Sequence, residues 1–298
     1  MTIRGVYAPV PTPFTEADEL DIPSWRSNVA RWMTTPLHGL VVLGTNGEAP
    51  LVDDDEADRL VAEARGQMPR ERLLIAGTGR QSTRATIRAS RRAAEAGADA
   101  VLVRTPSYFR GQMTREAFVP HYHAVADGSP VPVLLYNFTA LTGVTLPVDV
   151  VATLAAHPNI IGLKESGPDL SYVGDLIAVA PEGFSVLVGS ASTFFASLTL
   201  GAAGGVMAAA CVAPDECVQM YELVNAGRFD EARRVQRRVT PLAKQVTTVH
   251  GIPGLKAALA QLGYVGGPPR PPLRPVSREA DATIRQHVEQ FAAATVAG

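Results

Sequence analysis

The chain has 298 residues, of which 46% are hydrophobic and 19% charged, and its formal net charge is −2 at pH 7. This composition is typical of a globular protein with a sizeable core. A net charge so close to zero gives no reason to expect nucleic acid or an acidic membrane surface as a partner. No stretch reaches the roughly 20 uninterrupted apolar residues of a membrane span, so we expect no membrane partner.

The start of the sequence and its two cysteines favour the cytoplasm. Met1 to Gly5 leads directly into a strand-like run, without the apolar segment of a secretory signal. Cys211 and Cys217 have neither the spacing of a zinc site nor a nearby histidine. We interpret them as reduced thiols of a cytoplasmic protein, and we expect no metal site.

Short apolar runs alternate with amphipathic helical patterns along most of the chain. The runs predict strands at Val6–Val10, Gly39–Leu43, Leu73–Ala76, Ala100–Val103, Val131–Tyr136, Ile160–Lys164, Ser185–Val188 and Gly205–Ala208. The segments between them predict helices at Ser24–Thr34, Asp53–Gln67, Ser82–Ala96, Thr114–Ala126, Pro147–Ala156, Asp169–Ala180, Ser192–Leu200 and Pro214–Asn225. Eight such units predict an α/β fold of the (β/α)8 TIM barrel type over residues 1–226. An open doubly wound sheet is the alternative, and it would carry a glycine-rich phosphate turn after an early strand.

Further helical patterns follow the eighth unit, at Phe229–Thr248, Pro253–Leu262 and Arg278–Val296. We expect residues 227–298 to form a C-terminal helical layer packed on the barrel, within a single structural unit. The connector Gly266–Pro275 is rich in proline, which predicts an extended segment. A proline-motif ligand for a partner domain is the less favoured alternative.

The most informative stretch is Asn159–Gly167, in which an apolar run ends at Lys164. Only Lys164, Lys244 and Lys256 are lysines among the 27 Lys and Arg residues of the chain. Desolvation disfavours an ammonium, and a neutral lysine amine is a nucleophile towards a carbonyl carbon, which arginine cannot be. The alternative is a lysine whose stem packs on the strand end while its head reaches solvent.

In a (β/α)8 barrel the chemistry gathers at the carboxyl ends of the strands. The stretch Gly44-Thr45-Asn46-Gly47-Glu48 follows the second strand, where successive backbone N–H groups can turn towards one small anion. A plain turn is the alternative. Tyr136 ends the fifth strand beside Lys164 on the sixth, and a phenol beside an amine can donate and accept a proton. An aromatic plug with a satisfied hydroxyl is the alternative there.

Together, Gly44-Thr45-Asn46-Gly47-Glu48, Tyr108, Tyr136-Asn137 and Gly162-Leu163-Lys164-Glu165 resemble the dihydrodipicolinate synthase/N-acetylneuraminate lyase superfamily. The resemblance extends over nearly the whole chain. It implies a (β/α)8 barrel and a Schiff-base aldolase that handles pyruvate without a metal or an organic cofactor.

By this resemblance Lys164 is the lysine that forms the imine, and Tyr136 transfers protons beside it. Thr45 and Tyr108 complete a hydroxyl relay, in which Tyr108 reaches into the site of a neighbouring subunit. The usual assembly of the family implies a homotetramer built as a dimer of dimers.

The same resemblance places further residues around the substrate. The backbone of Thr45 and Asn46 would hold the pyruvate carboxylate, and Gly189 and Val206 would line the lysine pocket. Leu141 stands where the lysine-biosynthesis synthase carries an arginine for the carboxylate of its aldehyde, and a leucine cannot pair with an anion. Sialic acid is disfavoured as well, because Gly189-Ser190-Ala191-Ser192 offers only small groups after the seventh strand.

Several other stretches resemble 4-hydroxy-2-oxoglutarate aldolase, which splits its substrate into pyruvate and glyoxylate. They are Ala76-Gly77-Thr78-Gly79, Tyr108-Phe109-Arg110-Gly111, Leu146-Pro147-Val148-Asp149, His157-Pro158-Asn159-Ile160, Gly189-Ser190-Ala191, His250-Gly251-Ile252-Pro253-Gly254-Leu255-Lys256 and Gly266-Gly267-Pro268. In this interpretation Asn46 and Ser166 hydrogen-bond the distal carboxylate or the hydroxyl on carbon 4. We therefore predict a carbon–carbon lyase that cleaves 4-hydroxy-2-oxoglutarate or a similar 2-oxo acid aldol.

Two alternatives stay open at the level of sequence. One is a pyruvate-dependent synthase or dehydratase of the same superfamily, similar to dihydrodipicolinate synthase or to 2-keto-3-deoxy sugar acid aldolase. The other is a barrel that binds a 2-oxo acid without turnover. The joint presence of Lys164, Tyr136, Thr45 and Tyr108 favours catalysis, because a binding protein would not need all four.

Overall fold

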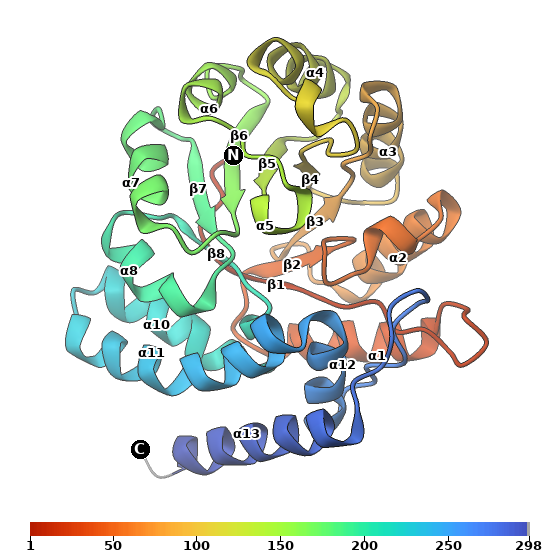
Figure 1. The fold of residues 1–298 in the computed structure, drawn as a ribbon, viewed down its shortest axis with the longest axis vertical. Coiled ribbons are helices and arrows are strands. Elements are labelled where there is room, and N and C mark those ends of the chain that lie inside the picture. The colour runs from red at the N-terminus through yellow and green to blue at the C-terminus, as the bar shows by residue number, and fades with distance from the viewer. Residues whose placement is uncertain (297–298) are drawn as a thin grey trace.

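A computed structural model describes residues 1–296, and within them eight parallel strands close into a barrel. The strands are β1 (Gly5–Pro9), β2 (Gly39–Val42), β3 (Leu73–Gly77), β4 (Ala100–Arg104), β5 (Val133–Asn137), β6 (Ile160–Glu165), β7 (Ser185–Val188) and β8 (Gly204–Val206). Each strand pairs with the next in chain order, and β8 pairs with β1 (Figure 1). The predicted (β/α)8 barrel is confirmed, and the predicted strands lie within one or two residues of the observed ones.

Helices follow the strands and surround the barrel. They are α1 (Ile22–Met33), α2 (Asp54–Gln67), α3 (Thr83–Glu95), α4 (Arg115–Gly128), α5 (Thr139–Thr142), α6 (Val148–Leu154), α7 (Leu170–Val179), α8 (Phe194–Thr199), α9 (Ala209–Val212) and α10 (Pro214–Asn225). The helices α1, α2, α3 and α7 begin with a polar side chain that caps the backbone. The Ser82 side chain accepts a hydrogen bond from the backbone N–H of Ala85 at the start of α3, and Asp53 and Glu56 form a capping box at the start of α2.

The alternation of side chains along the strands builds two apolar layers. In β4, Ala100 and Leu102 belong to a cluster inside the barrel, whereas Val101 and Val103 pack in the layer between strands and helices. Arg104 follows on the inner face, because side chains alternate with a period of two. The strand register places Arg104, Tyr136 and Lys164 in one row across β4, β5 and β6.

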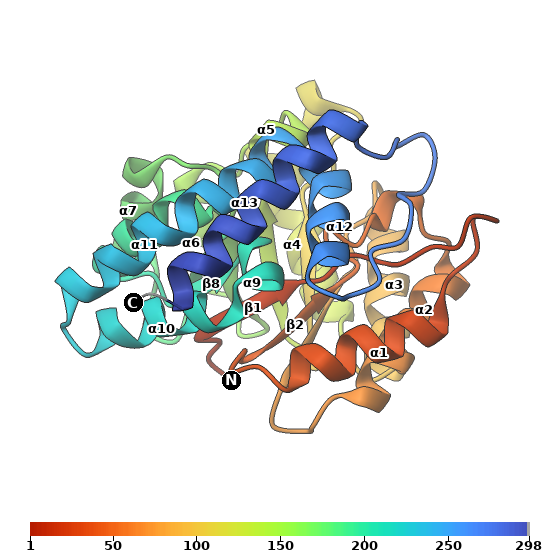
Figure 2. The same cartoon turned by 90° about the horizontal axis from the view of Figure 1, so that it is seen from below.

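The C-terminal layer consists of α11 (Phe229–Ala243), a π-helical segment (Lys244–Val249), α12 (Gly251–Gln261) and α13 (Arg278–Val296). Helix α11 packs on α10, and α13 crosses α11 and α12 on their outer side (Figure 2). The predicted helical segment Phe229–Thr248 is confirmed, since α11 and the π-helical segment together span it. The helix widens into π-type turns shortly after Pro241, a residue that cannot donate its backbone hydrogen bond.

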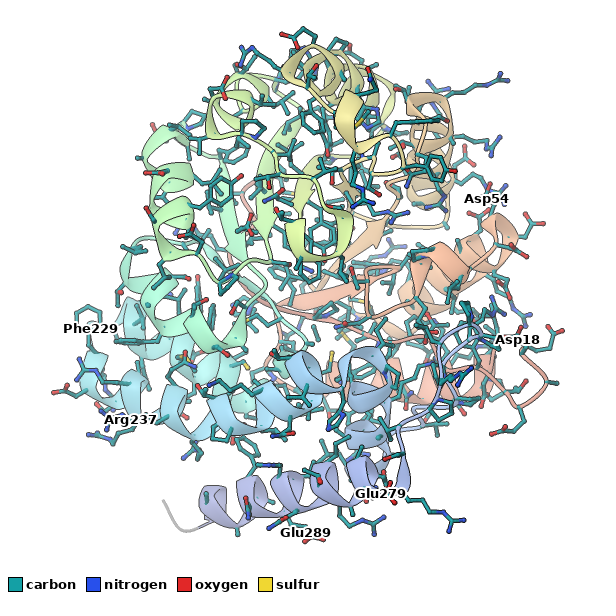
Figure 3. The ribbon with its side chains drawn as sticks, in the orientation of Figure 1. Asp18, Asp54, Phe229, Arg237, Glu279 and Glu289 are labelled. Carbon is teal, nitrogen blue, oxygen red and sulfur yellow. The ribbon has the colours of Figure 1, made fainter. Side chains whose placement is uncertain are left out.

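The proline-rich connector between α12 and α13 returns to the mouth of the barrel. There the Arg270 guanidinium lies 2.6 Å from Glu56 Oε2 and 2.9 Å from Asp18 Oδ1, so it ties the connector to α2 and to the loop before α1. Figure 3 shows Asp18 at this edge of the molecule. The Arg270 backbone N–H donates to Glu48 Oε2 at 2.8 Å. None of the described helices is long and apolar enough to cross a membrane.

Candidate active site

The loop after β2 forms one side of the barrel mouth and is held in a constrained backbone conformation. Leu43 and Glu48 both have positive φ, at 55° and 57°, which non-glycine residues rarely adopt. The backbone N–H of Glu48 donates to the carbonyl oxygen of Thr45 at 3.0 Å and so closes a tight turn. Such strain persists where the surrounding structure fixes it, and it clusters at functional sites.

Thr45, Tyr136 and Lys164 come together at the carboxyl ends of β2, β5 and β6. The Thr45 Oγ1 and Tyr136 Oη atoms are 3.0 Å apart, within hydrogen-bonding distance. The Lys164 Nζ atom lies 4.3 Å from the centre of the Tyr136 ring. The amine, the phenol and the threonine hydroxyl therefore form one contiguous cluster, which brings together three of the four residues proposed as catalytic.

The Lys164 side chain is buried, with 4% of its surface exposed. Among the described residues, no carboxylate lies within ion-pair distance of the Lys164 side-chain nitrogen. Lys256 is also buried, but its side chain is paired with Glu48. The alternative of a lysine head in solvent is therefore wrong. An unpaired, buried amine beside a phenol is suited to attack a carbonyl carbon.

A cavity of about 330 Å³ opens at this mouth. Its lining consists of Leu43, Gly44, Thr45, Glu48, Ala49, Pro50, Leu51, Gly77, Gly79, Leu102, Arg104, Ser107, Tyr136, Phe138, Leu141, Thr142, Ile252, Pro272 and Leu273. Lys164 is not part of this lining, but Tyr136 is, and its ring centre lies 4.3 Å from the Lys164 amine. The phenol and Thr45 thus connect the space for a ligand with the lysine.

The remaining residues predicted to bind substrate fall into two groups. Leu141, on α5, lines the cavity and is 63% exposed. Asn46, Ser166, Gly189 and Val206 do not line it. The Asn46 Nδ2 group donates to the carbonyl oxygen of Pro9 at 3.0 Å, so its carboxamide holds β1 in place.

Ser166 and Gly189 directly follow β6 and β7, and Val206 ends β8, so all three lie at the carboxyl ends of strands. A Cβ atom on Gly189 would come within 2.2 Å of Ser166 Oγ, so glycine at this position leaves room for the serine hydroxyl. Val206 is buried in the cluster inside the barrel. None of the three lines the cavity, and their predicted place beside the lysine stays a prediction.

Tyr108 lies apart from the cluster. Its side chain is 79% exposed, and its ring packs edge-on against Phe109, which is 69% exposed. The backbone N–H groups of Ser107 and Tyr108 both donate to Gln81 Oε1, which fixes the loop after β4. Within one chain Tyr108 therefore does not join Tyr136 and Thr45, and its predicted place in a neighbouring subunit stays a prediction.

Glu165 and Asn137 support the ends of β5 and β6 from outside the barrel. The Asn137 side chain donates from Nδ2 to Glu165 Oε2 at 2.5 Å and accepts a hydrogen bond from the backbone N–H of Leu146 at 3.0 Å. Burial raises the pKa of Glu165, and the hydrogen bonds from Asn137 and Gly167 oppose this rise. The pair positions Tyr136 and Lys164 through the strands that carry them.

Sequence reasoning missed several residues of the cavity. Arg104 extends β4 by one residue, and the period-two pattern of Ala100 and Leu102 was the signal that could have placed it inside the barrel. Pro272 and Leu273 come from the C-terminal connector, more than 200 residues after Thr45 in the chain. No local pattern indicates such a contact.

The described residues contain no group of three or more His, Cys, Asp or Glu that could hold a metal ion. The two cysteines, Cys211 and Cys217, are free and fully buried, and burial raises the pKa of both thiols. Cys211 Sγ donates to the carbonyl oxygen of Pro9 at 3.4 Å. Both thiols are therefore part of the packing.

The barrel, with a buried amine beside two hydroxyls at its mouth, defines the class of protein: a (β/α)8-barrel enzyme of the aldolase and lyase type. Comparison with known proteins gives the family. The model of the Dihydrodipicolinate synthetase family matches residues 2–291, and the chain belongs to this family. The predictions of the superfamily and of a lyase are confirmed.

Relatives cover almost the whole chain. A 4-hydroxy-tetrahydrodipicolinate synthase of Exiguobacterium sp. is 36% identical over 288 residues, which are 96% of this chain and 97% of the relative. A protein of Emericella nidulans named "Probable 4-hydroxy-2-oxoglutarate aldolase, mitochondrial" is 36% identical over 286 residues, 94% of this chain and 92% of that protein. Equal identity to two differently named relatives leaves the substrate undecided.

Solved structures agree with the fold. YagE of Escherichia coli, a prophage protein of the dihydrodipicolinic acid synthase family solved in complex with pyruvate, has a TM-score of 0.91 and 28% sequence identity. The similarity covers 97% of this chain and 99% of that chain.

Proposed function

We propose that the protein cleaves 4-hydroxy-2-oxoglutarate, or a similar 2-oxo acid aldol, to pyruvate and an aldehyde such as glyoxylate. The observation that carries the proposal is the cluster at the barrel mouth. The Thr45 and Tyr136 hydroxyls are 3.0 Å apart, and the unpaired Lys164 amine lies 4.3 Å from the Tyr136 ring centre. A proton relay and a nucleophile are the two groups that imine chemistry requires.

The turn after β2 supplies the site for the carboxylate next to the ketone. Among the described residues, no group accepts a hydrogen bond from the backbone N–H of Thr45 or of Asn46. Two adjacent free N–H groups, of Thr45 in the cavity lining and of Asn46 next to it in the chain, suit one carboxylate. Fixed donors of this kind orient a 2-oxo acid with its ketone towards Lys164.

The chemistry proceeds through a covalent imine without a bound cofactor. The Lys164 amine adds to the ketone carbon, and Tyr136 donates its proton to the departing hydroxyl, so that loss of water leaves a protonated imine and a Tyr136 phenolate. The protonated imine accepts the electrons of the bond between carbons 3 and 4, while the hydroxyl on carbon 4 loses its proton to Tyr136 and becomes the aldehyde. Protonation of the resulting enamine at carbon 3 and hydrolysis release pyruvate and free Lys164.

The substrate proposal also uses what the cavity lacks. Leu141 lines it at the place where the resemblance to the lysine-biosynthesis synthase implies an arginine, so the residue that holds the aldehyde carboxylate in that synthase is replaced here by an apolar one. A relative named as a 4-hydroxy-2-oxoglutarate aldolase supports this substrate, and a relative named as a synthase keeps a pyruvate-dependent synthase as the second candidate.

We also propose a homotetramer in which Tyr108 completes the hydroxyl relay of a neighbouring subunit. The exposure of Tyr108 and Phe109, at 79% and 69%, supports an interface at this loop, because large exposed aromatic side chains mark interaction sites. The cytoplasmic location stays a prediction.

The test is pyruvate release from 4-hydroxy-2-oxoglutarate, followed with a lactate dehydrogenase couple, for the wild type and for Lys164→Arg. We expect release from the wild type and none from the variant, because arginine keeps the charge but cannot form an imine. A wild type that releases no pyruvate, but condenses pyruvate with an aldehyde from a panel, would replace the lyase by the synthase. An active Lys164→Arg variant would refute the role of the lysine.

A further inference from the structure

Arg104 is a positive charge at the mouth of the barrel that the proposed chemistry has not used. It ends β4 on the inner face, in the same row as Tyr136 on β5 and Lys164 on β6, and it lines the cavity. Two strand spacings separate the backbones of Arg104 and Lys164, which is about 10 Å. A ligand that reaches the amine can therefore also reach the guanidinium.

The guanidinium group has no anionic partner in the described part of the chain. Its hydrogen bond there runs from Nε to the carbonyl oxygen of Gly79, at a long 3.4 Å. Arg80, its cationic neighbour, is paired with Asp54 at 3.3 Å, and Arg92 and Arg270 are likewise paired with carboxylates. A partly buried cation without a counter-ion costs free energy, which a bound anion would recover.

The electrostatic surroundings agree with this geometry. Burial lowers the pKa of Arg104, and the charge of Arg80 lowers it further, against an opposing effect of Tyr136. Both effects disfavour the charged form, so an anion in the cavity would relieve them.

The loop after β3 leaves room for this side chain at Gly79. A Cβ atom on Gly79 would lie 2.7 Å from Arg104 Cγ and 2.6 Å from its backbone nitrogen, so the arginine stem packs directly on the glycine backbone. Gly79 also lines the cavity. The position of the arginine is thus built into the fold.

We propose that Arg104 binds a second carboxylate, carried by the distal half of the 2-oxo acid, and so makes the enzyme selective for dicarboxylic substrates. The inference rests on the proposed function, since it assumes that the ketone end of the ligand reacts with Lys164. Arg104 would give the distal carboxylate a charged partner. Leu141 offers no such partner, and the Asn46 side-chain nitrogen already donates to the carbonyl oxygen of Pro9. Arg104 is therefore a specificity-determining residue in contact with the substrate.

The experiment measures imine formation instead of turnover. The 2-oxo acid is added with borohydride, and the half-saturating concentration for trapping is compared between 2-oxoglutarate and 2-oxopentanoate. These acids have the same chain length, but the second ends in a methyl group. Wild type, Arg104→Gln and Arg104→Lys are compared with Arg84→Gln, which removes the charge of an exposed arginine on α3.

We expect the wild type to prefer 2-oxoglutarate and Arg104→Gln to lose this preference by roughly 10- to 100-fold, the range of a charge-assisted hydrogen bond. Arg104→Lys should retain part of the preference, and Arg84→Gln all of it. Trapping of pyruvate should be unchanged in Arg84→Gln.

Two results would overturn the inference and leave the proposed function standing. One is a preference for 2-oxoglutarate that Arg104→Gln preserves. The other is a wild type that traps pyruvate but traps neither 2-oxoglutarate nor 2-oxopentanoate, or traps these two acids equally well. Failure to trap pyruvate in the wild type is different, because it would remove the proposed function itself and this inference with it.

Discussion

The hydroxyl of Tyr136 is the group on which proton transfer depends at the residue scale. It lies 3.0 Å from Thr45 Oγ1, and its ring contacts the Lys164 amine. We predict that Tyr136→Phe lowers kcat for aldol cleavage by about 10²- to 10⁴-fold, because a general acid–base group contributes that much to the rate. Steady-state kinetics with the lactate dehydrogenase couple measure this change.

Tyr7→Phe is the matched control for that variant. Tyr7 is also a buried tyrosine inside the barrel, but its hydroxyl donates to the carbonyl oxygen of Arg4, far from the β-strand ends that carry the site. Its loss should cost about 1 kcal/mol of stability without slowing the reaction. Equal kcat values for Tyr136→Phe and the wild type would contradict the relay.

How far the site could be predicted also depends on single residues. Lys164 and Tyr136 could be found because each ends an apolar strand with a polar group, and neighbouring strand ends meet in a barrel. Arg104 was missed because one arginine after a strand looks like the start of a loop. The position of Tyr108 could not be tested within one chain, since its predicted contact lies in another subunit.

At the scale of elements, one buried ion pair joins α12 to the loop after β2. Lys256 Nζ lies 2.5 Å from Glu48 Oε1, and both side chains are at most 2% exposed. Burial lowers the pKa of Lys256, and the attraction of Glu48 opposes this effect. The pair holds the connector near the cavity, where Pro272 and Leu273 form part of the wall.

Breaking this pair should therefore affect stability and binding together. We predict that Lys256→Met destabilises the protein by about 3–5 kcal/mol, because Glu48 is left as an uncompensated buried charge. Urea unfolding measures the loss, and KM should rise as the cavity wall loosens. Lys244→Met, at an exposed lysine, is the control, and Glu48→Gln added to Lys256→Met should recover much of the stability.

The connector has a second, pH-sensitive attachment at Glu56. The hydrogen bond from Arg270 lowers the pKa of Glu56 below its ordinary 4.5, against the opposing effect of burial. A carboxyl group with a lowered pKa in the folded state stabilises the protein above its unfolded pKa, and this contribution is lost as the pH falls through the folded pKa.

We predict that Glu56→Gln is less stable than the wild type at pH 7 and that this gap closes as the pH falls below 4.5. Urea midpoints measured in steps from pH 7 downwards test the sign. The control is Glu63→Gln, which removes an ion pair with the half-exposed Arg26. Its loss of stability relative to the wild type should be smaller than that of Glu56→Gln at every pH measured. A gap that widens in acid would contradict the assignment.

Most elements could be predicted because the barrel repeats one local pattern. Buried strands such as Val101–Val103 and amphipathic helices such as α3 are encoded by neighbouring residues. The short helices α5 and α9 were missed, since four residues carry no period. The path of the connector depends on Arg270 contacts with Asp18 and Glu56, which are remote in sequence.

At the scale of the whole molecule, we propose that the barrel (1–226) and the helical extension (227–298) form one structural unit. The packing of α11 on α10 and the buried pair of Glu48 and Lys256 tie the two parts together. The connector also completes the cavity. Calorimetry should therefore give one unfolding transition for both parts, and two separate transitions would contradict this proposal.

The proposed assembly makes a prediction that mixing subunits can test. If Tyr108 acts in a neighbouring site, Tyr108→Phe and Lys164→Arg should each be inactive alone. Hybrid oligomers refolded from both variants should recover part of the activity, because a subunit with Lys164 then meets a partner with Tyr108. Hybrids without activity, or a fully active monomer in sedimentation, would show that the tyrosine is not shared.

The central claim is that Lys164 forms an imine with a 2-oxo acid, and borohydride trapping with pyruvate tests it most directly. The chain has Lys164, Lys244 and Lys256 as its only lysines, so peptide mass mapping assigns the adduct without ambiguity. We predict a reduced adduct on Lys164 that depends on pyruvate. No adduct, or an adduct on Lys244 or Lys256 alone, would contradict the account.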